Sequence, residues 1–347
     1  MNLFGYLRFL MCATTVFAVW QQPFLPKHTA TGGKNVLIII ADDLRTSLGC
    51  YGDSAVKSPN IDHLASQSII FTNAYAQQAV CAPSRVSFLT GRRPDTTRLF
   101  DFNSYWRTHA GNYTTLPQYF KEHGYVTMSV GKIFHPGISS NHSDDYPYSW
   151  SVYPYHPSAE KYENSQEFLK LYPIENISLA PDPDIPKKLP LVAYNPWTDI
   201  RKREDVQALN ISFPYGPIPE HFQLLIRQSY YASVSYLDDQ IGQLLNAVED
   251  LGLSNDTIIV FSSDHGWSLG EHGEWAKYSN FDVTTRVPLI FYVPGMTNIP
   301  QQPIFQYIDP FSTNLQRKFP GKQHFSFMLY IEDYGMLHFP LTPVTSH

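Results

Sequence analysis

Cysteine is scarce in this chain of 347 residues, which contains only Cys12, Cys50 and Cys81. Cys12 lies in an N-terminal segment that we expect to be removed, so two cysteines would remain in the mature chain. Two cysteines cannot build a disulfide scaffold, and a fold of this length must therefore be held by its core. If Cys81 is chemically modified, Cys50 stands alone, and we expect it to be a buried thiol.

The sequence also lacks an excess of positive charge. It carries 25 Lys and Arg residues against 31 Asp and Glu residues, which gives a formal net charge of −6. Nothing marks a broad basic surface, so nucleic-acid binding has no support, and a polyanionic ligand would need a local basic pocket. Hydrophobic residues make up 43% of the chain, which argues against a disordered protein and allows a sizeable core.

No run after the N-terminus is long and apolar enough to predict a membrane span. Residues 9–20 form an apolar run of signal-peptide length after Arg8, and we interpret residues 1–25 as a signal peptide. A buried N-terminal element is the alternative. Five N-x-S/T sequons favour a glycoprotein of the secretory pathway, at Asn112, Asn141, Asn176, Asn210 and Asn255.

Buried strands alternate with helices along most of the chain. Apolar runs predict strands over 35–41, 69–71, 125–130, 257–261 and 288–293, and helices are expected after Ser58-Pro59 and over 86–89, 115–123 and 222–251. This order predicts an α/β fold with a large, mixed, mostly parallel sheet flanked by helices. We expect one catalytic domain over residues 33–311, with an irregular insert over 136–219 and a divergent tail over 312–347.

Acidic residues follow two of these strands. Asp42 and Asp43 come directly after the first strand, while Asp264 and His265 follow the strand that begins at residue 257. Ligands of such sheets bind at the carboxyl ends of the strands, and carboxylate oxygens suit Ca²⁺. The alternative is that the Asp pair only caps a turn. His265 departs from an all-oxygen ligand set.

The most specific pattern is CAPSR at residues 81–85, followed by LTGR at residues 89–92. It resembles the C-x-P-x-R signature of the sulfatase family, in which the cysteine is oxidised to formylglycine. For an isolated cysteine, a buried structural thiol would be the ordinary interpretation. The resemblance extends from about residue 35 to residue 311, and it implies an alkaline-phosphatase-like fold and the hydrolysis of sulfuric esters.

Four longer stretches narrow this resemblance: GRRPDTTRLFDFNSYW, GKIFHPGISSNHSDDYPYSW, DPDIPKKLPLVAYNPW and SSDHGWSLGEHGEWAKYSNFDV. They resemble the lysosomal sulfatases that remove the 2-sulfate from terminal iduronate of heparan and dermatan sulfate. The resemblance therefore implies a sulfated glycosaminoglycan as substrate and delivery to the lysosome through the secretory pathway. It also implies the formylglycine-generating enzyme as a partner.

The resemblance also assigns roles to individual residues. Cys81 would be the precursor of the nucleophile and would join Asp42, Asp43, Asp264 and His265 around one Ca²⁺. The other four positions would act on the sulfate or the nucleophile: Lys132 and Lys277 would hold sulfate oxygens, His135 would assist collapse of the sulfated diol, and Arg85 would steady the nucleophile.

The chain departs from the family pattern in two places. Between Asn164 and Glu167 the resemblance skips several dozen residues, which in the family hold a helix, a core strand and a Lys-Pro-His element with a histidine at the sulfate. After residue 311 it stops, so the smaller C-terminal subdomain has no counterpart. Two alternatives follow: a truncated, weakly active or inactive homologue, or a phosphonate or phosphate monoester hydrolase of the same superfamily. A two-zinc phosphatase would need a second ligand set, which the sequence lacks.

Overall fold

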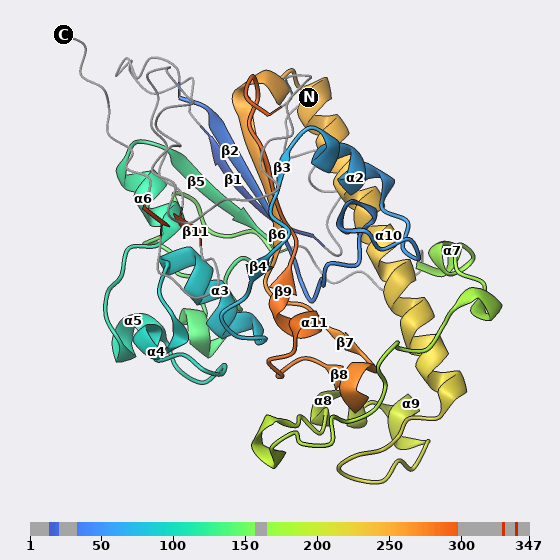
Figure 1. Ribbon diagram of the computed structural model, residues 1–347. Helices are drawn as coiled ribbons and strands as arrows, with labels where there is room; N and C mark the ends of the chain where they lie inside the picture. Colours follow the sequence, from blue (N-terminus) through green and yellow to red (C-terminus); the bar gives the residue numbers. More distant parts are fainter. Residues whose placement is uncertain (1–13, 21–32, 157–164, 298–327, 330–336, 339–347) are drawn as a thin grey trace.

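The computed structural model describes residues 14–20, 33–156, 165–297, 328–329 and 337–338. A six-stranded sheet lies at its centre, as Figure 1 shows. In spatial order the strands are β3 (Ile69–Ile70), β10 (Leu289–Tyr292), β6 (Thr257–Ser263), β2 (Asn35–Ala41), β1 (Thr14–Trp20) and β5 (Val126–Val130). Strands β2 and β6 pair in parallel, whereas β1 and β10 run antiparallel to each of their neighbours. The sheet is therefore mixed, with four strands in one direction.

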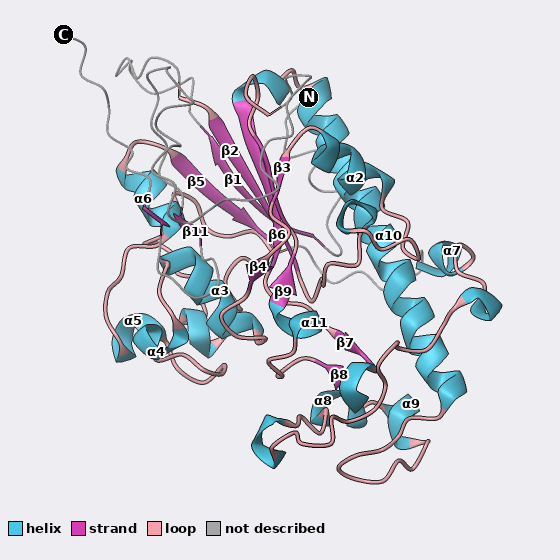
Figure 2. Ribbon diagram, in the orientation of Figure 1, coloured by secondary structure: helices cyan, strands magenta, loops and turns pink. Residues whose placement is uncertain are grey.

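Helices cover both faces of the sheet (Figure 2). Strand β2 shows why, because its side chains alternate between two apolar clusters. Leu37 and Ile39 pack with residues of α2 (Pro59–Ser66) and α10 (Glu220–Asp250), while Ile38 and Ile40 pack with residues of α3 (Cys81–Thr90) and with Phe120 of α6 (Leu116–Glu122). Burial on both sides explains the unbroken apolar run, and it fixes the carboxyl end of β2 in place.

Shorter elements complete the chain. The helices are α4 (Pro94–Thr97), α5 (Trp106–His109), α7 (Ser165–Leu169), α8 (Thr198–Arg201), α9 (Glu204–Gln207) and α11 (Asp282–Thr285). The 3₁₀ turns are η1 (Gly49–Tyr51), η2 (Ile138–Ser140), η3 (Ile174–Asn176), η4 (Leu191–Ala193), η5 (Ser254–Asp256) and η6 (Glu271–Gly273). Three strand pairs lie outside the main sheet: β4 (Ala74–Tyr75) with β9 (Arg286–Val287), β7 (Ser268–Leu269) with β8 (Trp275–Ala276), and β11 (Met328–Leu329) with β12 (Leu337–His338).

Helix α3 is longer than the sequence predicts. It begins at Cys81 rather than near residue 86, and it ends at Gly91, whose φ of 63° lies in the left-handed region. Pro83 is tolerated because the first turn of a helix needs no intrahelical N–H donors. Cys81 is thus the first residue of a helix and does not lie in the loop before it.

The structure describes three of the predicted segments to different extents. Strand β1 lies inside the predicted signal peptide and pairs on both sides, with β2 and with β5. This pairing is what the alternative, a buried N-terminal element, predicts. The other residues of 1–25 lie outside the described residues. Cleavage of a leader remains a prediction. The described parts of the insert over 136–219 hold only short helices, which agrees with its irregular pattern. Most of the tail over 312–347 lies outside the described residues. No helix in the described ranges is both long and apolar enough to span a membrane.

Candidate active site and metal centre

The acidic pairs that follow β2 and β6 meet at one edge of the sheet. The register pairs Ala41 with Ser263, so the residues that follow these two lie side by side. One carboxylate oxygen of Asp264 accepts hydrogen bonds from the backbone N–H of Asp43 (3.1 Å) and of His265 (2.9 Å). Asp264 is fully buried, as is His265, whereas Asp42 and Asp43 keep partial exposure. The structure therefore brings together all four residues that the sequence places at strand ends.

Cys81 lies against this acidic edge at the first residue of α3, and it is buried. Its Sγ lies 3.3 Å from Nε2 of His265 and 3.1 Å from Nζ of Lys277. Two groups of possible ligand atoms share Cys81, one with Asp43 and His265 and one with Asp42 and Asp264, and the atoms of each group lie within 4.8 Å of one another. Cys81 is therefore common to both halves of the candidate centre.

Arg85 joins the two acidic strand ends from one turn further along α3. Its side chain is fully buried, with Nε donating to Asp264 (3.0 Å) and Nη2 donating to Asp42 (2.9 Å). Nη1 donates to the backbone carbonyls of Lys132 and Ile133. Burial alone would lower the pKa of Arg85, but Asp264 and Asp42 raise it, so the guanidinium is a permanent cation.

Two lysines reach the same cluster from other elements. Lys132, in the loop after β5, donates from Nζ to both oxygens of Asp42, at 2.9 and 2.8 Å. Lys277, directly after β8, donates to Asp43 (2.9 Å) and to Cys81, and its Nζ lies 5.6 Å from the centroid of the Trp267 ring. Burial would lower the pKa of Lys277, yet Asp43 and Cys81 raise it, so the amine stays protonated.

The charges at this edge are unevenly distributed. Burial would raise the pKa of Asp42, but Arg85 and Lys132 hold it well below its usual value. The pKa of Asp43 is raised by burial and by repulsion from Asp42, in spite of Lys277. Burial would lower the pKa of His265, while Asp264 and its other polar neighbours bring it to about 9. Asp43 is thus the carboxylate whose negative charge is least compensated.

This donor set fits a hard divalent cation. Asp42, Asp43 and Asp264 offer oxygen atoms of the kind that Ca²⁺ prefers, and a cation would relieve the repulsion that raises the pKa of Asp43. His265 adds a ring nitrogen beside these oxygens, which Ca²⁺ seldom uses. The residues present therefore fit Ca²⁺ through their oxygens, and the structure leaves the role of His265 as a ligand a prediction.

Among the described residues, no hydrogen bond joins the His135 side chain to the cluster, although Lys132, Arg85 and Asp42 all act on its pKa. Its ring is half-buried and packs on Phe102, with the ring centroids 4.5 Å apart. Burial and the charge of Lys132 lower the pKa of His135, so the ring is neutral near pH 7. Among the described residues it makes no hydrogen bond to Cys81. Two histidines near the gap in the family pattern also lie elsewhere: His156 is paired with Asp144, and His221 is exposed at the start of α10.

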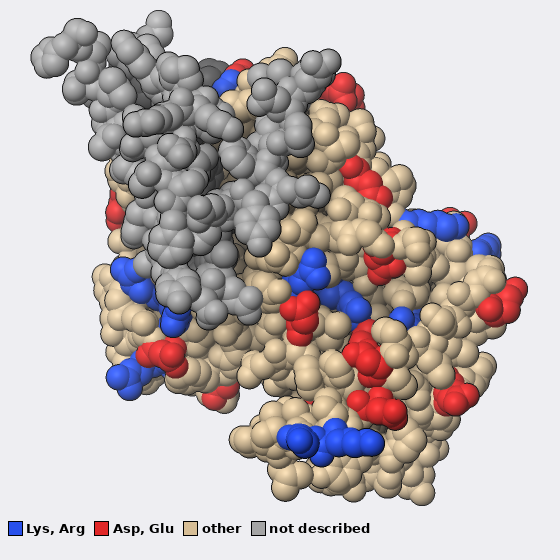
Figure 3. All heavy atoms as spheres, in the orientation of Figure 1, with Lys and Arg blue, Asp and Glu red and all other residues tan. Residues whose placement is uncertain are grey.

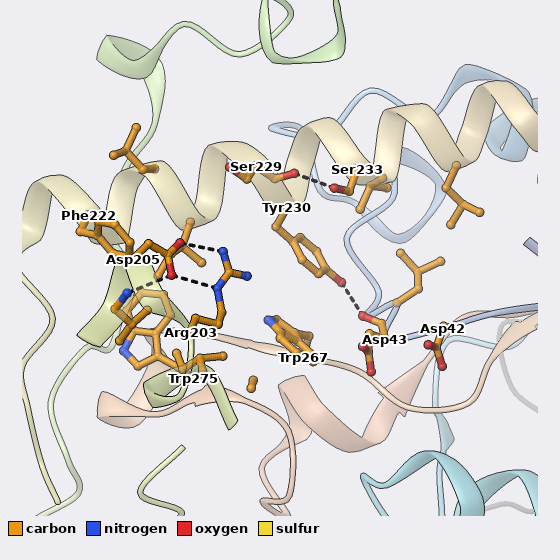
Figure 4. A pocket seen from close by; sticks show the side chains of 18 residues that line it. Asp42, Asp43, Arg203, Asp205, Phe222, Ser229, Tyr230, Ser233, Trp267 and Trp275 are labelled. Carbon is orange, nitrogen blue, oxygen red and sulfur yellow. Dashed lines mark hydrogen bonds and ion pairs between the residues drawn. The ribbon is translucent and has the colours of Figure 1, made fainter. Parts of the chain in front are cut away.

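A cavity of about 570 Å³ opens next to the acidic edge. Asp42 and Asp43 lie at one end of it, and Tyr230, Trp267 and Trp275 line its length, as Figure 4 shows. The face drawn in Figure 3 mixes basic and acidic side chains, in keeping with the local rather than broad basic character expected from the composition. The sequence alone did not identify Tyr230 as a site residue, because it lies in the apolar stripe of a long helix. The only signal was its hydroxyl, which needs a partner when buried.

Comparison with known families gives a match over most of the chain. The family model described as Sulfatase matches residues 34–316. Iduronate 2-sulfatase of Homo sapiens is 59% identical over 366 residues, and the alignment covers 85% of this chain and 66% of that protein. Iduronate 2-sulfatase of Mus musculus is 60% identical over 365 residues, with the same coverage. The chain thus spans just under two thirds of the length of these curated relatives.

The first alignment also contains gaps in this chain. It runs over 366 positions, yet 85% of 347 residues is only about 295, so several tens of aligned positions have no residue in this chain. The skipped stretch expected near Asn164 agrees with this. Among solved structures, a 2-O GAG sulfatase superposes with a TM-score of 0.52 at 18% identity, covering 77% of this chain and 65% of that one. At this identity the likeness shows the fold alone.

Proposed function

Since the chain belongs to the sulfatase family, we propose that it is a sulfuric ester hydrolase whose nucleophile is a formylglycine made from Cys81. The observation that carries the proposal is the position of Cys81. It is the first residue of α3, its Sγ lies 3.1 Å from Nζ of Lys277, and the carboxylates of Asp42, Asp43 and Asp264 surround it. Sulfatases use formylglycine and a metal, and this cluster contains residues suited to both.

The aldehyde explains why an oxidised cysteine is needed. The formylglycine-generating enzyme would oxidise the Cys81 side chain with molecular oxygen, so that the C–S bond breaks, the sulfur leaves, and the CH₂–SH carbon becomes an aldehyde. The aldehyde then adds water to give two hydroxyls on one carbon. One hydroxyl attacks the sulfur and displaces the sugar oxygen, which leaves with a proton. The second hydroxyl then loses its proton, the C=O bond forms again, and the C–O bond to the sulfate breaks. A serine has no second hydroxyl on that carbon, so it could not release sulfate in this way.

The surrounding side chains have separate tasks in this proposal. Lys132 and Lys277 are the cations placed to hold sulfate oxygens, and Arg85 fixes the two acidic strand ends against α3. His135, neutral at pH 7, would accept the proton of the second hydroxyl. Bound Ca²⁺ would add positive charge that polarises the sulfate and lowers the pKa of the attacking hydroxyl. Lys132, Lys277 and Arg85 each already donate a hydrogen bond to a carboxylate of the cluster, whereas no such bond joins the His135 ring to the cluster among the described residues.

The substrate class rests on the relatives. Both mammalian relatives are named iduronate 2-sulfatase, so we propose a terminal 2-sulfated iduronate of heparan or dermatan sulfate as the substrate and the lysosome as the place of action. All five sequon asparagines are exposed and would be accessible to the glycosylation machinery. The second candidate is an inactive or weakly active homologue. It is supported by the alignment gap and by His156, which is paired with Asp144.

One experiment separates the two candidates. The chain would be made in secretory cells that contain the formylglycine-generating enzyme and then digested. Mass spectrometry would measure the mass of the peptide that contains residue 81. The same sample would be assayed on a 2-sulfated iduronide, with a Cys81→Ala variant as control. Formylglycine with turnover that the variant lacks supports the enzyme. Formylglycine without turnover supports the inactive homologue, and an unmodified cysteine rejects the proposed nucleophile.

A further inference from the structure

Tyr230 connects α10 to the turn that carries Asp43. In Figure 4 its side chain projects from the helix toward that turn. The Tyr230 hydroxyl accepts a hydrogen bond from the backbone N–H of Arg45 (3.0 Å) and donates one to the backbone carbonyl of Asp43 (2.9 Å). Burial raises the pKa of Tyr230, so the hydroxyl keeps the proton that it donates. One side-chain oxygen thus pairs with two backbone groups of the turn.

The turn at Asp43 needs such support. Its φ of 61° lies in the left-handed region, which residues other than glycine adopt rarely. The same backbone conformation aims the Asp43 carboxylate, whose Oδ1 lies 2.9 Å from Nζ of Lys277 and 3.4 Å from Nδ1 of His265. A change of the turn would therefore move a candidate ligand and the contact of a candidate sulfate-binding lysine together.

The side chain of Arg45 forms a second tether from the same turn. Its Nη1 donates to Glu271 (2.7 Å) and to the backbone carbonyl of Trp267 (3.3 Å). Glu271 is buried and also accepts the N–H of Leu269 (2.7 Å). Leu269 belongs to the β7–β8 pair, which Lys277 directly follows, and Arg227 of α10 donates to the Leu269 carbonyl (3.0 Å). Helix α10 therefore holds both the Asp43 turn and the strand pair that carries Lys277.

We propose that Tyr230 is a positioning residue for the metal centre, which holds Asp43 in the orientation needed to bind the cation. The inference rests on the proposed function, because it presupposes that Asp43 is a ligand. Tyr230 itself does not reach the reacting atoms and acts through the backbone of residues 43–45. Groups that orient ligands in this way commonly change metal affinity by about 10–100-fold when they are removed.

The test compares two adjacent tyrosines of α10. Tyr230→Phe removes only the hydroxyl and leaves the ring packed. Tyr231→Phe is the matched control, because the Tyr231 hydroxyl is also buried and accepts a hydrogen bond from Arg227 (2.8 Å), but it makes no hydrogen bond to residues 43–45. Calorimetric titration of each full chain with Ca²⁺ should show at least roughly tenfold weaker binding for Tyr230→Phe. Tyr231→Phe should bind within about twofold of the unaltered chain.

A second measurement, made without metal, addresses the turn directly. The Arg45 amide should lose protection from hydrogen exchange in Tyr230→Phe and keep it in Tyr231→Phe, because only the first variant removes its acceptor. If the unaltered chain binds Ca²⁺ and Tyr230→Phe binds equally well, the inference is wrong and the proposed function stands. Unchanged Arg45 exchange in Tyr230→Phe would also overturn it. If the unaltered chain binds no Ca²⁺, the proposed metal centre fails and the inference fails with it.

Discussion

Arg85→Gln should destabilise the protein severely, and the reason lies in what the change leaves behind. Arg85 and Asp264 are both completely buried, and they are joined at 3.0 Å. Asp42 would still have Lys132 as a partner after the change. Among the residues that the structure describes, the other ion-pair partner of Asp264 is His265, at 3.7 Å. Glutamine is neutral, so a buried carboxylate would lose its closest opposing charge.

The expected cost follows from that uncompensated charge. Removing one partner of a buried ion pair costs about 3–5 kcal/mol. Domains of moderate size lose about 2–4 °C in Tm for each kcal/mol, so Tm should fall by roughly 6–20 °C. The cost is a large part of the roughly 5–15 kcal/mol that holds a typical domain together. Arg203→Gln is a matched control, since the Arg203–Asp205 pair is close as well (2.7 Å) but its side chains are 66% and 44% exposed. Such a pair contributes about 0–1 kcal/mol.

Thermal melts followed by circular dichroism would compare the two variants with the unaltered chain. The Arg85→Gln melt should lie far below that of Arg203→Gln, which should stay within about 4 °C of the unaltered chain. If the two variants melted within 2 °C of each other, the loss of the buried Arg85–Asp264 pair would not cost the expected stability, and the prediction would be wrong.

Three further predictions concern Asp42, Cys50 and Glu271. Asp42→Ala should remove bound Ca²⁺ and turnover together, and full calcium occupancy by elemental analysis of that variant would count against the site. Burial and the neighbouring Asp62 raise the pKa of the half-buried Cys50 to about 12. Iodoacetamide at pH 8 should therefore label Cys50 only after the chain is unfolded, which peptide mass spectrometry would measure, and rapid labelling of the native chain would contradict this. Burial would raise the pKa of Glu271, but Arg45 holds it below its usual 4.5. A carboxyl whose pKa is lower in the folded chain than in the unfolded chain stabilises the fold above the unfolded pKa, and this stabilisation is lost as the pH falls through the folded pKa. Glu271→Gln should therefore destabilise the protein less at acid pH than at pH 7 in urea titrations, and equal losses at both pH values would refute the prediction.

Much of the fold is readable from local patterns. The strands β2, β5, β6 and β10 and the helices α2, α6 and α10 lie where periodicity, Ser58-Pro59 and Gly124 indicate. The start of α3 was misplaced by five residues, because Pro83 and the small residues near it hide the first turn. The place of residues 14–20 in the sheet could not be predicted. An apolar run is typical of a leader and of a central strand alike, and the pairing of residues 14–20 with β2 and β5 depends on distant segments that the run itself does not reveal.

The sequence by itself determined the family and the chemical groups, because these depend on residue types at fixed local spacing. The CAPSR and LTGR patterns mark Cys81 as the candidate precursor of the nucleophile, and the position of Asp42, Asp43 and Asp264 after apolar runs marks them as candidate metal ligands. The tertiary structure alone decided which groups meet. Arg85 bridges two strand ends, and Lys277 reaches Cys81. The His135 ring packs on Phe102, and Tyr230 holds the Asp43 turn. The Arg85–Asp264, Tyr230–Asp43 and Lys277–Cys81 contacts join residues 179, 187 and 196 positions apart. Such contacts depend on strand register and helix packing, which no local pattern records.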